Sequence, residues 1–436
     1  MEQTQTIRLA TFVAETGFDN LPPAVLQAGK RCFLDCLGTA LGGAHSRAAT
    51  MVAELAAESG GKPQATLLAR GKLAPLLDAA LINATAAHAL DYDDTLSPPA
   101  ALAGLAVAEY HRLSGRNLIT SYVLGFEIAS RLASAIGGWD NARGWHMMGV
   151  AGGFGAAATG AVLLRLTPDQ TAHALGIAAT QAAGLVAMHG SLVKPVHSGK
   201  AAANGLFAAQ LAKRGCTSGP ALEGPSSLAH AMGGEADFDL TKKLGQSYAI
   251  LENRLKPFPC GRLGHAAIEA ALKARSGHDL NPAAIHSVRV HVNPRAQYLM
   301  GGGEPQNGTQ AMFSIAHGVA AALLVGQAGP AQFTDEAAQD PLLADLRQRV
   351  EVIADPGQKP GQATIEVKRK DSGALAAEVQ IQKGYAANPM NDGDVREKFL
   401  SLAEPVLGSL RANKVAELVY GVETLADAGE LARLCS

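Results

Sequence analysis

Two short segments of the chain combine a lysine with proline and a second basic side chain. One runs Lys256-Pro-Phe-Pro-Cys-Gly-Arg262-Leu-Gly-His265, and the other runs Lys194-Pro-Val-His197-Ser-Gly-Lys200. Proline restricts the backbone beside each lysine, so the ammonium group leaves a stiffened chain in a defined direction. A lysine among apolar residues can bind a carboxylate or, once desolvated, act as a base, and the pair predicts a site for a polyanionic small molecule. The alternative at either position is a surface lysine whose charge stays in water.

Carboxylates are concentrated in the segment His88-Ala-Leu-Asp91-Tyr-Asp93-Asp94-Thr95. Like charges this close do not all ionise easily, so one carboxyl is expected to have a raised pKa suited to proton transfer. The alternative is that Asp93 or Asp94 caps the next helix and the others are solvated. The segment lacks the regular alternation and the glycine of a calcium loop, so no metal is expected.

A histidine stands at the predicted start of a helix, where Trp145-His146 precedes the small-residue run Ala151-Gly-Gly-Phe-Gly155. Such a histidine can act as an acid or base near neutral pH, although a hydrogen-bonded structural histidine is the alternative. The glycine run is not a dinucleotide fingerprint, because no strand precedes it. Neither a phosphate loop nor a nucleophile elbow is present, and no cofactor is expected.

Composition excludes several broad classes of protein. The chain has 436 residues, of which 47% are hydrophobic, enough for a large buried core and more than one domain. Its formal net charge of -2 provides no global field for nucleic acid or an anionic membrane. No apolar run reaches the roughly 18 residues of a membrane span. The five cysteines are scattered and odd in number, which argues against a disulfide framework and favours the cytoplasm.

The elements that must position these residues change in character after Lys256. The first half is rich in alanine and leucine with helical spacing. Helices are expected at 26–41, 76–89, 100–111, 119–137, 149–166, 170–188 and 201–214. Strand-like alternation follows at 287–292, 364–369 and 377–383, with helices at 311–325 and 341–350 between the strands and at 392–407 and 413–434 after them. We therefore predict a large all-helical domain (1–260, completed by helices in 395–436) and a smaller α+β domain (261–394).

Taken together, the motifs resemble those of the MmgE/PrpD family across nearly the whole chain. They are the segment from His88 to Thr95, Gly144-Trp-His146, the two lysine segments, and Pro389-Met-Asn-Asp392. The resemblance implies a fold that is mainly α with a smaller α+β domain, an active site between the two domains, and a homodimer. It also implies that Asp91, His146, Lys194 and Lys256 are catalytic. Thr95, His197, Arg262 and His265 are expected to bind substrate.

The chain departs from the family pattern at three places. The family has a histidine soon after the position of Thr95, whereas this chain has Leu96-Ser97-Pro98-Pro99. His317 stands where members commonly have tyrosine, and it is expected to be catalytic as a replacement acid. Gly261 stands where the family's decarboxylase has histidine.

The resemblance implies chemistry on a small di- or tricarboxylate with an acidic C–H bond, because the family's substrates are of this class. Lys194, Lys256 and Arg262 would hold the carboxylates while His146 or Asp91 moves a proton. Loss of a β-hydroxyl would make the protein a dehydratase-type lyase, which is the expected function. Loss of CO2 would make it a decarboxylase, and return of the proton to the other face an epimerase or isomerase. An inactive ligand-binding homologue is the remaining alternative.

Overall fold

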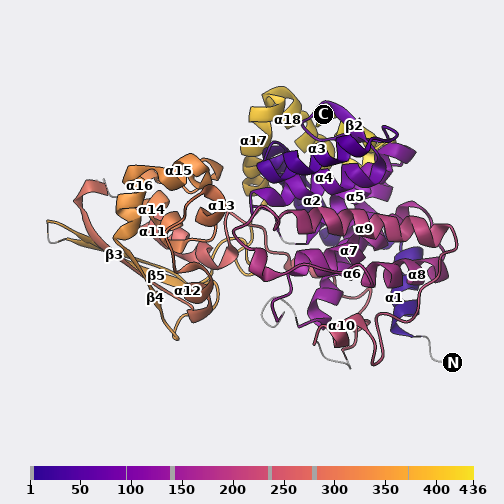
Figure 1. Cartoon of the computed structure of the whole chain (residues 1–436), viewed down its shortest axis with the longest axis horizontal. Coiled ribbons are helices and arrows are strands. Elements are labelled where there is room, and N and C mark those ends of the chain that lie inside the picture. Colours follow the sequence, from indigo (N-terminus) through magenta and orange to yellow (C-terminus); the bar gives the residue numbers. More distant parts are fainter. Residues whose placement is uncertain (1–3, 95, 138–142, 234–237, 277–281, 372) are drawn as a thin grey trace.

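A computed structural model describes residues 4–94, 96–137, 143–233, 238–276, 282–371 and 373–436 of the chain. Figure 1 shows a large helical lobe beside a smaller lobe in which helices cover a sheet. The predicted fold class, mainly α with a smaller α+β domain, is confirmed. Among the described residues, none of the helices has the length and apolarity to cross a membrane.

The large lobe is built from closely packed helices rich in small residues. Helix α7 lies at its centre, against α5, α6 and α9. A side chain at Gly205 of α9 would put a Cβ atom 2.2 Å from the Gly153 carbonyl oxygen of α7, so glycine is required for this approach. The helices of this part are α1 (Gln5–Glu15), α2 (Pro23–Gly43), α3 (Arg47–Ser59), α4 (Leu76–Ala89), α5 (Ser97–His111), α6 (Gly115–Ala135), α7 (Met147–Leu163), α8 (Pro168–Ala179), α9 (Val196–Lys213) and α10 (Leu228–Ala231).

Three predictions for this lobe are wrong in detail. The helix predicted at 413–434 is divided into two helices, Ser409–Tyr420 and Gly429–Leu434, with a 3-10 turn at Val422–Thr424 between them. The lobe is not all-helical, because β1 (Ala65–Leu67) and β2 (Lys72–Ala74) pair as a short antiparallel hairpin. The helix predicted at 170–188 ends at Ala179, and the 3-10 turn η2 (Val186–Met188) follows. Gly184, with its φ of +136°, prevents one helix from running through the whole predicted range.

The smaller lobe has a four-stranded mixed sheet in the order β4-β3-β5-β6. Strand β3 (Ile285–Val292) pairs in parallel with β4 (Val350–Ala354) and antiparallel with β5 (Ala363–Arg369), which pairs antiparallel with β6 (Ala374–Val379). Helices α11 (His265–Arg275) and α14 (Ile315–Val325) pack on this sheet. The remaining helices are α12 (Pro294–Met300), α13 (Gly308–Ala311), α15 (Asp335–Gln339) and α16 (Pro341–Gln348).

The sheet differs from its prediction at two strands. Strand β4 was not predicted, since the predicted helix ran to Val350, whereas α16 ends at Gln348 and Val350 is the first residue of the strand. The last strand was predicted at 377–383 but ends at Val379, because Val379 pairs with Ala363, the first residue of β5, and no partner continues beyond it.

The chain returns to the large lobe through α17 (Asp392–Leu407), α18 (Ser409–Tyr420) and α19 (Gly429–Leu434). Helix α17 packs on α2, and Figure 1 shows these yellow C-terminal helices beside the indigo N-terminal ones. One hydrophobic core includes residues from Leu9 to Leu255 and from Met390 to Cys435, and the second spans Cys260 to Val379. The domain boundaries near 260 and 395 remain a prediction, and the change of core falls close to them.

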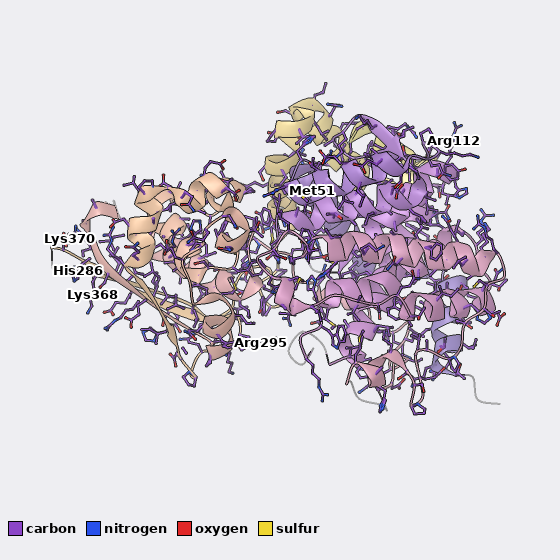
Figure 2. The ribbon with its side chains drawn as sticks, viewed as in Figure 1. Met51, Arg112, His286, Arg295, Lys368 and Lys370 are labelled. Carbon is purple, nitrogen blue, oxygen red and sulfur yellow. The ribbon has the colours of Figure 1, made fainter. Side chains whose placement is uncertain are left out.

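Surface charge is distributed over both lobes. Figure 2 shows His286, Lys368 and Lys370 at the end of the sheet far from the large lobe, whereas Arg112 lies on the opposite lobe.

All five cysteines are free thiols, and four of them are buried.

Candidate active site

The Asp91 carboxylate is the centre of a buried cluster of charged side chains. It lies two residues after the end of α4, in a left-handed conformation with φ of +48° that aspartate adopts more readily than most residues. Its Oδ1 atom accepts a hydrogen bond from the Lys194 Nζ atom and lies 3.0 Å from the Lys256 Nζ atom. Lys256 also donates to the Asp91 carbonyl oxygen at 2.7 Å. The structure thus brings together three of the predicted catalytic residues.

Electrostatics fix the protonation of this group. Burial alone would raise the pKa of the Asp91 carboxyl, but the Lys194 and Lys256 ammonium groups outweigh burial and hold that pKa well below its usual range. Burial lowers the pKa of Lys194, and the Asp91 charge offsets part of this effect. The Asp91 carboxylate therefore stays ionised and compensates the positive charge of two buried lysines.

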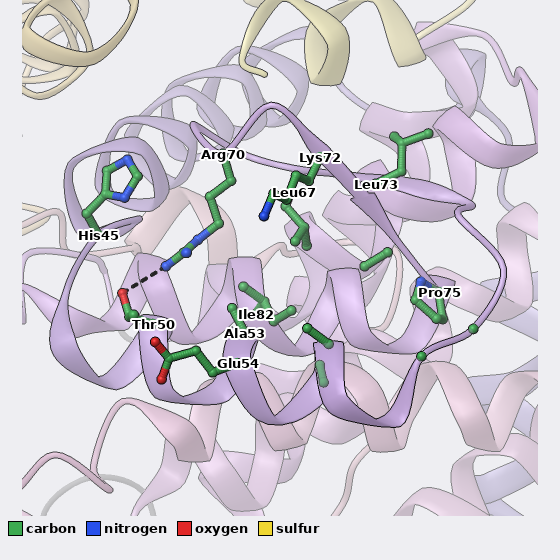
Figure 3. Close-up of a pocket in the computed structure, with 15 residues that line it drawn as sticks. His45, Thr50, Ala53, Glu54, Leu67, Arg70, Lys72, Leu73, Pro75 and Ile82 are labelled. Carbon is green, nitrogen blue, oxygen red and sulfur yellow. Dashed lines mark hydrogen bonds between the residues drawn. The ribbon is translucent and has the colours of Figure 1, made fainter.

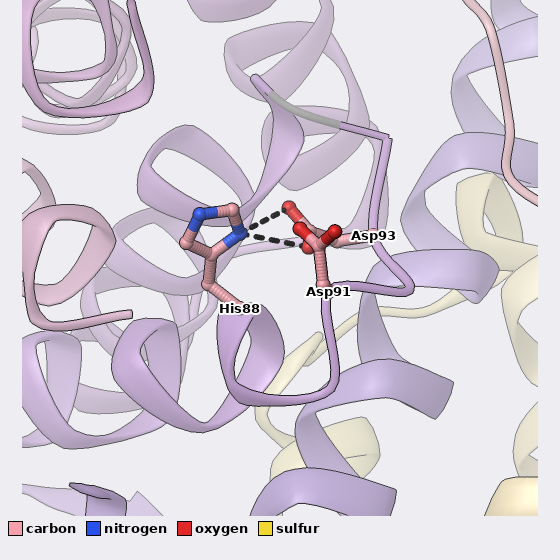
Figure 4. A group of neighbouring side chains, drawn as sticks. All are labelled: His88, Asp91 and Asp93. Atoms are coloured by element: carbon pink, nitrogen blue, oxygen red, sulfur yellow. Dashed lines mark hydrogen bonds and ion pairs between the residues drawn. The ribbon is translucent and has the colours of Figure 1, made fainter. Parts of the chain in front are cut away.

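His88 and Asp93 form a second buried pair beside Asp91, as Figure 4 shows. The His88 Nδ1 atom lies 2.8 and 2.9 Å from the two Asp93 carboxylate oxygens. Burial would raise the Asp93 pKa, but His88 outweighs it and lowers that pKa to about 2. The prediction of a raised carboxyl pKa in this segment is therefore wrong for Asp91 and Asp93, because cations or imidazole face both. Asp94 instead follows the capping alternative, accepting from the Leu96 and Ser97 amides.

Ligand atoms of His88, Asp91 and Asp93 lie within 4.8 Å of one another, a spacing that a metal ion could use. The contacts that these three side chains already make do not fit a metal site. Two lysine ammonium groups already balance Asp91, and both Asp93 oxygens face His88. A divalent ion here would lie beside two like charges in a buried site, at a large electrostatic cost.

His146 lies directly before α7 and is surrounded by other imidazoles. Its Nδ1 atom is 2.9 Å from the Nδ1 atom of His197, which is half-buried on α9. The His88 ring stacks on it at 5.5 Å between centroids, and the His189 ring approaches edge-on at 5.3 Å. Burial and then His88 and Lys194 lower the His146 pKa well below its usual range, so the ring is neutral at neutral pH.

His189 and Phe313 were not predicted. His189 follows η2, is exposed on one side, and stacks on Phe313 of the smaller lobe at 5.0 Å between ring centroids. The Lys194 Nζ atom lies 5.8 Å from the centre of the same Phe313 ring. Phe313 thus forms a wall between the two lobes at this site. A sequence signal was available, since His189, Lys194 and His197 fall within nine positions.

A buried lysine from the C-terminal helices supports the loops that carry these groups. The Lys398 Nζ atom of α17 lies 2.6 Å from the Asp35 Oδ1 atom of α2 and donates to the carbonyl oxygens of Tyr92 at 2.6 Å and Lys256 at 3.0 Å. The Tyr92 hydroxyl donates to the Pro257 carbonyl oxygen at 3.0 Å. Burial raises the pKa of the Asp35 carboxyl to about 6. Lys398 therefore joins the Asp91 loop to the Lys256 loop.

The other predicted site residues lie in different surroundings. Arg262 is half-buried and donates to the Asp94 carbonyl oxygen at 2.7 Å. His265 is buried, and its Nε2 atom lies 3.1 Å from the Cys260 carbonyl oxygen, so it supports the loop after Lys256. Thr95 lies outside the described residues.

The structure places His317 inside the second hydrophobic core. Its Nε2 atom lies 2.7 Å from the Gln332 carbonyl oxygen, and its Nδ1 atom accepts from Arg347 at 2.9 Å. Both ring nitrogens therefore have protein partners in the smaller lobe. Among the described residues, no contact joins His317 to the Asp91 cluster.

A cavity of about 510 Å³ lies elsewhere, between α3 and the β1–β2 hairpin. Figure 3 shows Arg70, Lys72, His45 and Glu54 around it, with Arg70 bonded to Thr50. Acidic and basic side chains both line this cavity, and the residues of the Asp91 cluster are not among its lining residues.

Proteins with these two lobes and this arrangement of motifs define the MmgE/PrpD class, and the chain belongs to this family. Its residues 7–241 match the MmgE/PrpD N-terminal domain and residues 258–423 match the C-terminal domain.

Curated relatives match the chain over almost its whole length. It is 29% identical over 472 residues to a cis-aconitate decarboxylase-like protein of Aspergillus oryzae, covering 100% of this chain and 98% of that protein. It is 28% identical over 472 residues to a cis-aconitate decarboxylase of Aspergillus terreus, covering 98% and 95%. The cis-aconitate decarboxylase of Mus musculus is 25% identical over 448 residues, with 95% and 90% covered.

Proposed function

We propose that this protein is a cofactor-independent lyase of the dehydratase type that acts on a small di- or tricarboxylate. The observation that carries the proposal is the Asp91 carboxylate held between two buried lysines beside a neutral His146. Such a site offers a base for a C–H bond and cations for the negative charge that develops when the bond breaks. The protein is further proposed to work as a homodimer in the cytoplasm.

The hydrogen bond between His146 and His197 defines how the base would work. If the His146 Nδ1–H group donates to the His197 Nδ1 atom, the His146 Nε2 atom keeps a free lone pair. That atom takes the proton next to a substrate carboxylate, and the electron pair left on carbon is delocalised into that carboxylate. Lys194 and Lys256 stabilise the resulting charge, while Asp91 holds both ammonium groups in place. His197 would then orient the base rather than bind substrate.

Departure of a β-hydroxyl group would complete a dehydration. A decarboxylase is the second candidate, because the relatives are named as cis-aconitate decarboxylases and align over nearly the whole chain. In that reaction CO2 leaves with cleavage of a C–C bond, and the carbon that keeps the electron pair takes up a proton. Both reactions require carboxylate-binding cations and at least one proton-carrying group on the protein.

One experiment separates these reactions. The protein would be incubated in deuterium oxide with citrate, 2-methylcitrate and cis-aconitate, and followed by proton NMR. An unsaturated product with release of water supports the dehydratase, and release of CO2 supports the decarboxylase. Deuterium entry without a net product indicates an epimerase or isomerase. Binding without any exchange or product would contradict the proposal and leave a ligand-binding homologue.

A further inference from the structure

Most titratable side chains of the cluster are committed to one another. The two lysines bind Asp91, His88 binds Asp93, and His146 binds His197. His189 differs from all of them. Among the described residues, its ring nitrogens have no hydrogen-bond partner, and part of the ring is exposed. Because neither ring nitrogen is committed to a partner in the described part of the protein, His189 can pass a proton between solvent and a bound molecule.

The backbone holds His189 at a fixed place relative to His146. The His146 amide donates to the Gly184 carbonyl oxygen at 3.0 Å, and the Val186 amide donates to the Gly144 carbonyl oxygen at 2.8 Å. Gly184 must be glycine, since its φ is +136° and a Cβ atom there would lie 3.3 Å from the His197 Nδ1 atom. The His189 amide then closes η2 by donating to the Val186 carbonyl oxygen at 2.9 Å. These backbone hydrogen bonds set the distance between the His146 and His189 rings.

Phe313 fixes the other side of the ring. It stacks on His189 with an angle of 23° between the ring planes and also faces the Lys194 ammonium group. His189 is thus placed between the base on one lobe and an apolar wall from the other. A group in this position can reach a molecule bound between Lys194 and His146, while its exposed edge exchanges protons with water.

We propose that His189 is the proton donor of the site and acts on the substrate from a position beside the base His146. This inference rests on the proposed lyase function. In a dehydration, His146 takes the proton from carbon, the C–H electron pair forms the C=C bond, and the C–O bond breaks. The hydroxyl group leaves as water with the proton from His189. In a decarboxylation, the same proton goes to the carbon that keeps the electron pair of the broken C–C bond.

The charged groups near His189 indicate when its ring would take up a proton. In the free protein, burial and then Lys194 lower its pKa to about 4, with Asp91 opposing and His88 and Lys256 adding to the effect. A bound polycarboxylate would add negative charge beside Lys194 and remove most of that repulsion. Protonation of His189 would then be coupled to substrate binding.

Two measurements on the full-length protein test the inference, with citrate as the polycarboxylate probe. The first is NMR of protein with labelled histidine, in which the signal missing from His189→Gln identifies His189. We expect its pKa to rise by at least about one unit when citrate is saturating. The second is turnover of the polycarboxylate that the wild-type protein converts. His189→Gln should lower kcat by about 100-fold or more with little change in KM, and should keep wild-type deuterium exchange at the reacting carbon of a dehydration substrate.

The matched control is His230→Gln, which changes an exposed histidine on α10, outside the cluster. It should leave kcat and the His189 signal unchanged. Wild-type kcat in His189→Gln, or a His189 pKa that bound citrate does not change, would overturn the inference and leave the lyase proposal standing. A wild-type protein that neither binds nor converts any polycarboxylate would overturn both.

Discussion

Replacing Asp91 with asparagine tests the electrostatic centre of the site most directly. Asparagine has nearly the same shape, tolerates the left-handed conformation of residue 91, and can still accept a hydrogen bond, so the change removes mainly the charge. It leaves two buried ammonium groups, Lys194 and Lys256, facing each other without a counter-ion. The expected result is a folded but strongly destabilised protein.

The magnitude can be bounded in two ways. Removing one partner of a buried ion pair typically costs about 3–5 kcal/mol. The remaining lysines can relieve the repulsion if one loses its proton. With an unfolded-state pKa near 10.4, that loss costs about 5 kcal/mol at pH 7 and about 2 kcal/mol at pH 9. We therefore expect Asp91→Asn to lower the free energy of unfolding by about 3–5 kcal/mol at pH 7 and by no more than about 2 kcal/mol at pH 9.

The sign of this pH dependence follows from proton binding. In the variant, a folded-state lysine has a pKa below its unfolded value, so the unfolded chain binds more protons and stability rises with pH. The assay is urea unfolding at pH 7 and pH 9, followed by the fluorescence of Trp139 and Trp145, which both belong to the N-terminal half of the chain.

Asp19→Asn is the matched control, because Asp19 forms an exposed ion pair with Arg116. It should change stability by less than about 1 kcal/mol at either pH. A deficit for Asp91→Asn that is below about 1 kcal/mol at pH 7, or that does not shrink at pH 9, would refute the description of a carboxylate compensating two charged lysines.

Three further changes test other parts of the site. Lys256→Ala should lower kcat/KM by about 100-fold or more while the circular dichroism spectrum stays unchanged, and wild-type turnover would remove Lys256 from the site. Burial and then Lys256 lower the pKa of His265 to about 3, so stability should fall as the pH drops below 6.5. In urea unfolding between pH 7 and 5, His265→Gln should remove up to about 1.4 kcal/mol per pH unit of that slope, and an unchanged slope would contradict a neutral buried His265. Lys398→Met should cost about 3–5 kcal/mol because Asp35 is left buried and unpaired, and adding Asp35→Asn should restore stability in urea but not turnover. Recovery of both properties would show that Lys398 has no positioning role.

The sequence predicted the architecture because the helical and alternating patterns are strong and local. Helix 76–89 has the predicted bounds, and so does helix 392–407. The prediction of helix 170–188 failed because the alanine-rich sequence pattern continues past the residue at which the helix ends. The alanine-rich run from residue 170 continues beyond Ala179, but Gly184 turns the chain, and that turn is what brings His189 to His146.

The charged side chains of the Asp91 cluster were predicted to lie together, but the residues that support the cluster were not predicted. Asp91, Lys194 and Lys256 meet as expected, whereas the protonation of the carboxylates depends on partners that only the fold brings near. Lys398 and Asp35 were not predicted, because a lysine in an amphipathic helix usually points to solvent. His317 was expected at the site from its aligned position, but its side-chain direction could not be known from sequence. That direction depends on Arg347 and Gln332, which hold its ring.

The contacts of Lys398 have a consequence for how the protein is made. Its ammonium group binds the Tyr92 carbonyl oxygen, 306 positions earlier in the chain, and the Lys256 carbonyl oxygen, 142 positions earlier. During synthesis, the ribosome releases the helices around Asp91 long before Lys398 exists. A nascent chain can thus build most of the first hydrophobic core while the loops that carry Asp91 and Lys256 are still unjoined. Joining of these two loops is therefore expected late in folding, and a chain interrupted before residue 398 would lack the lysine that connects them.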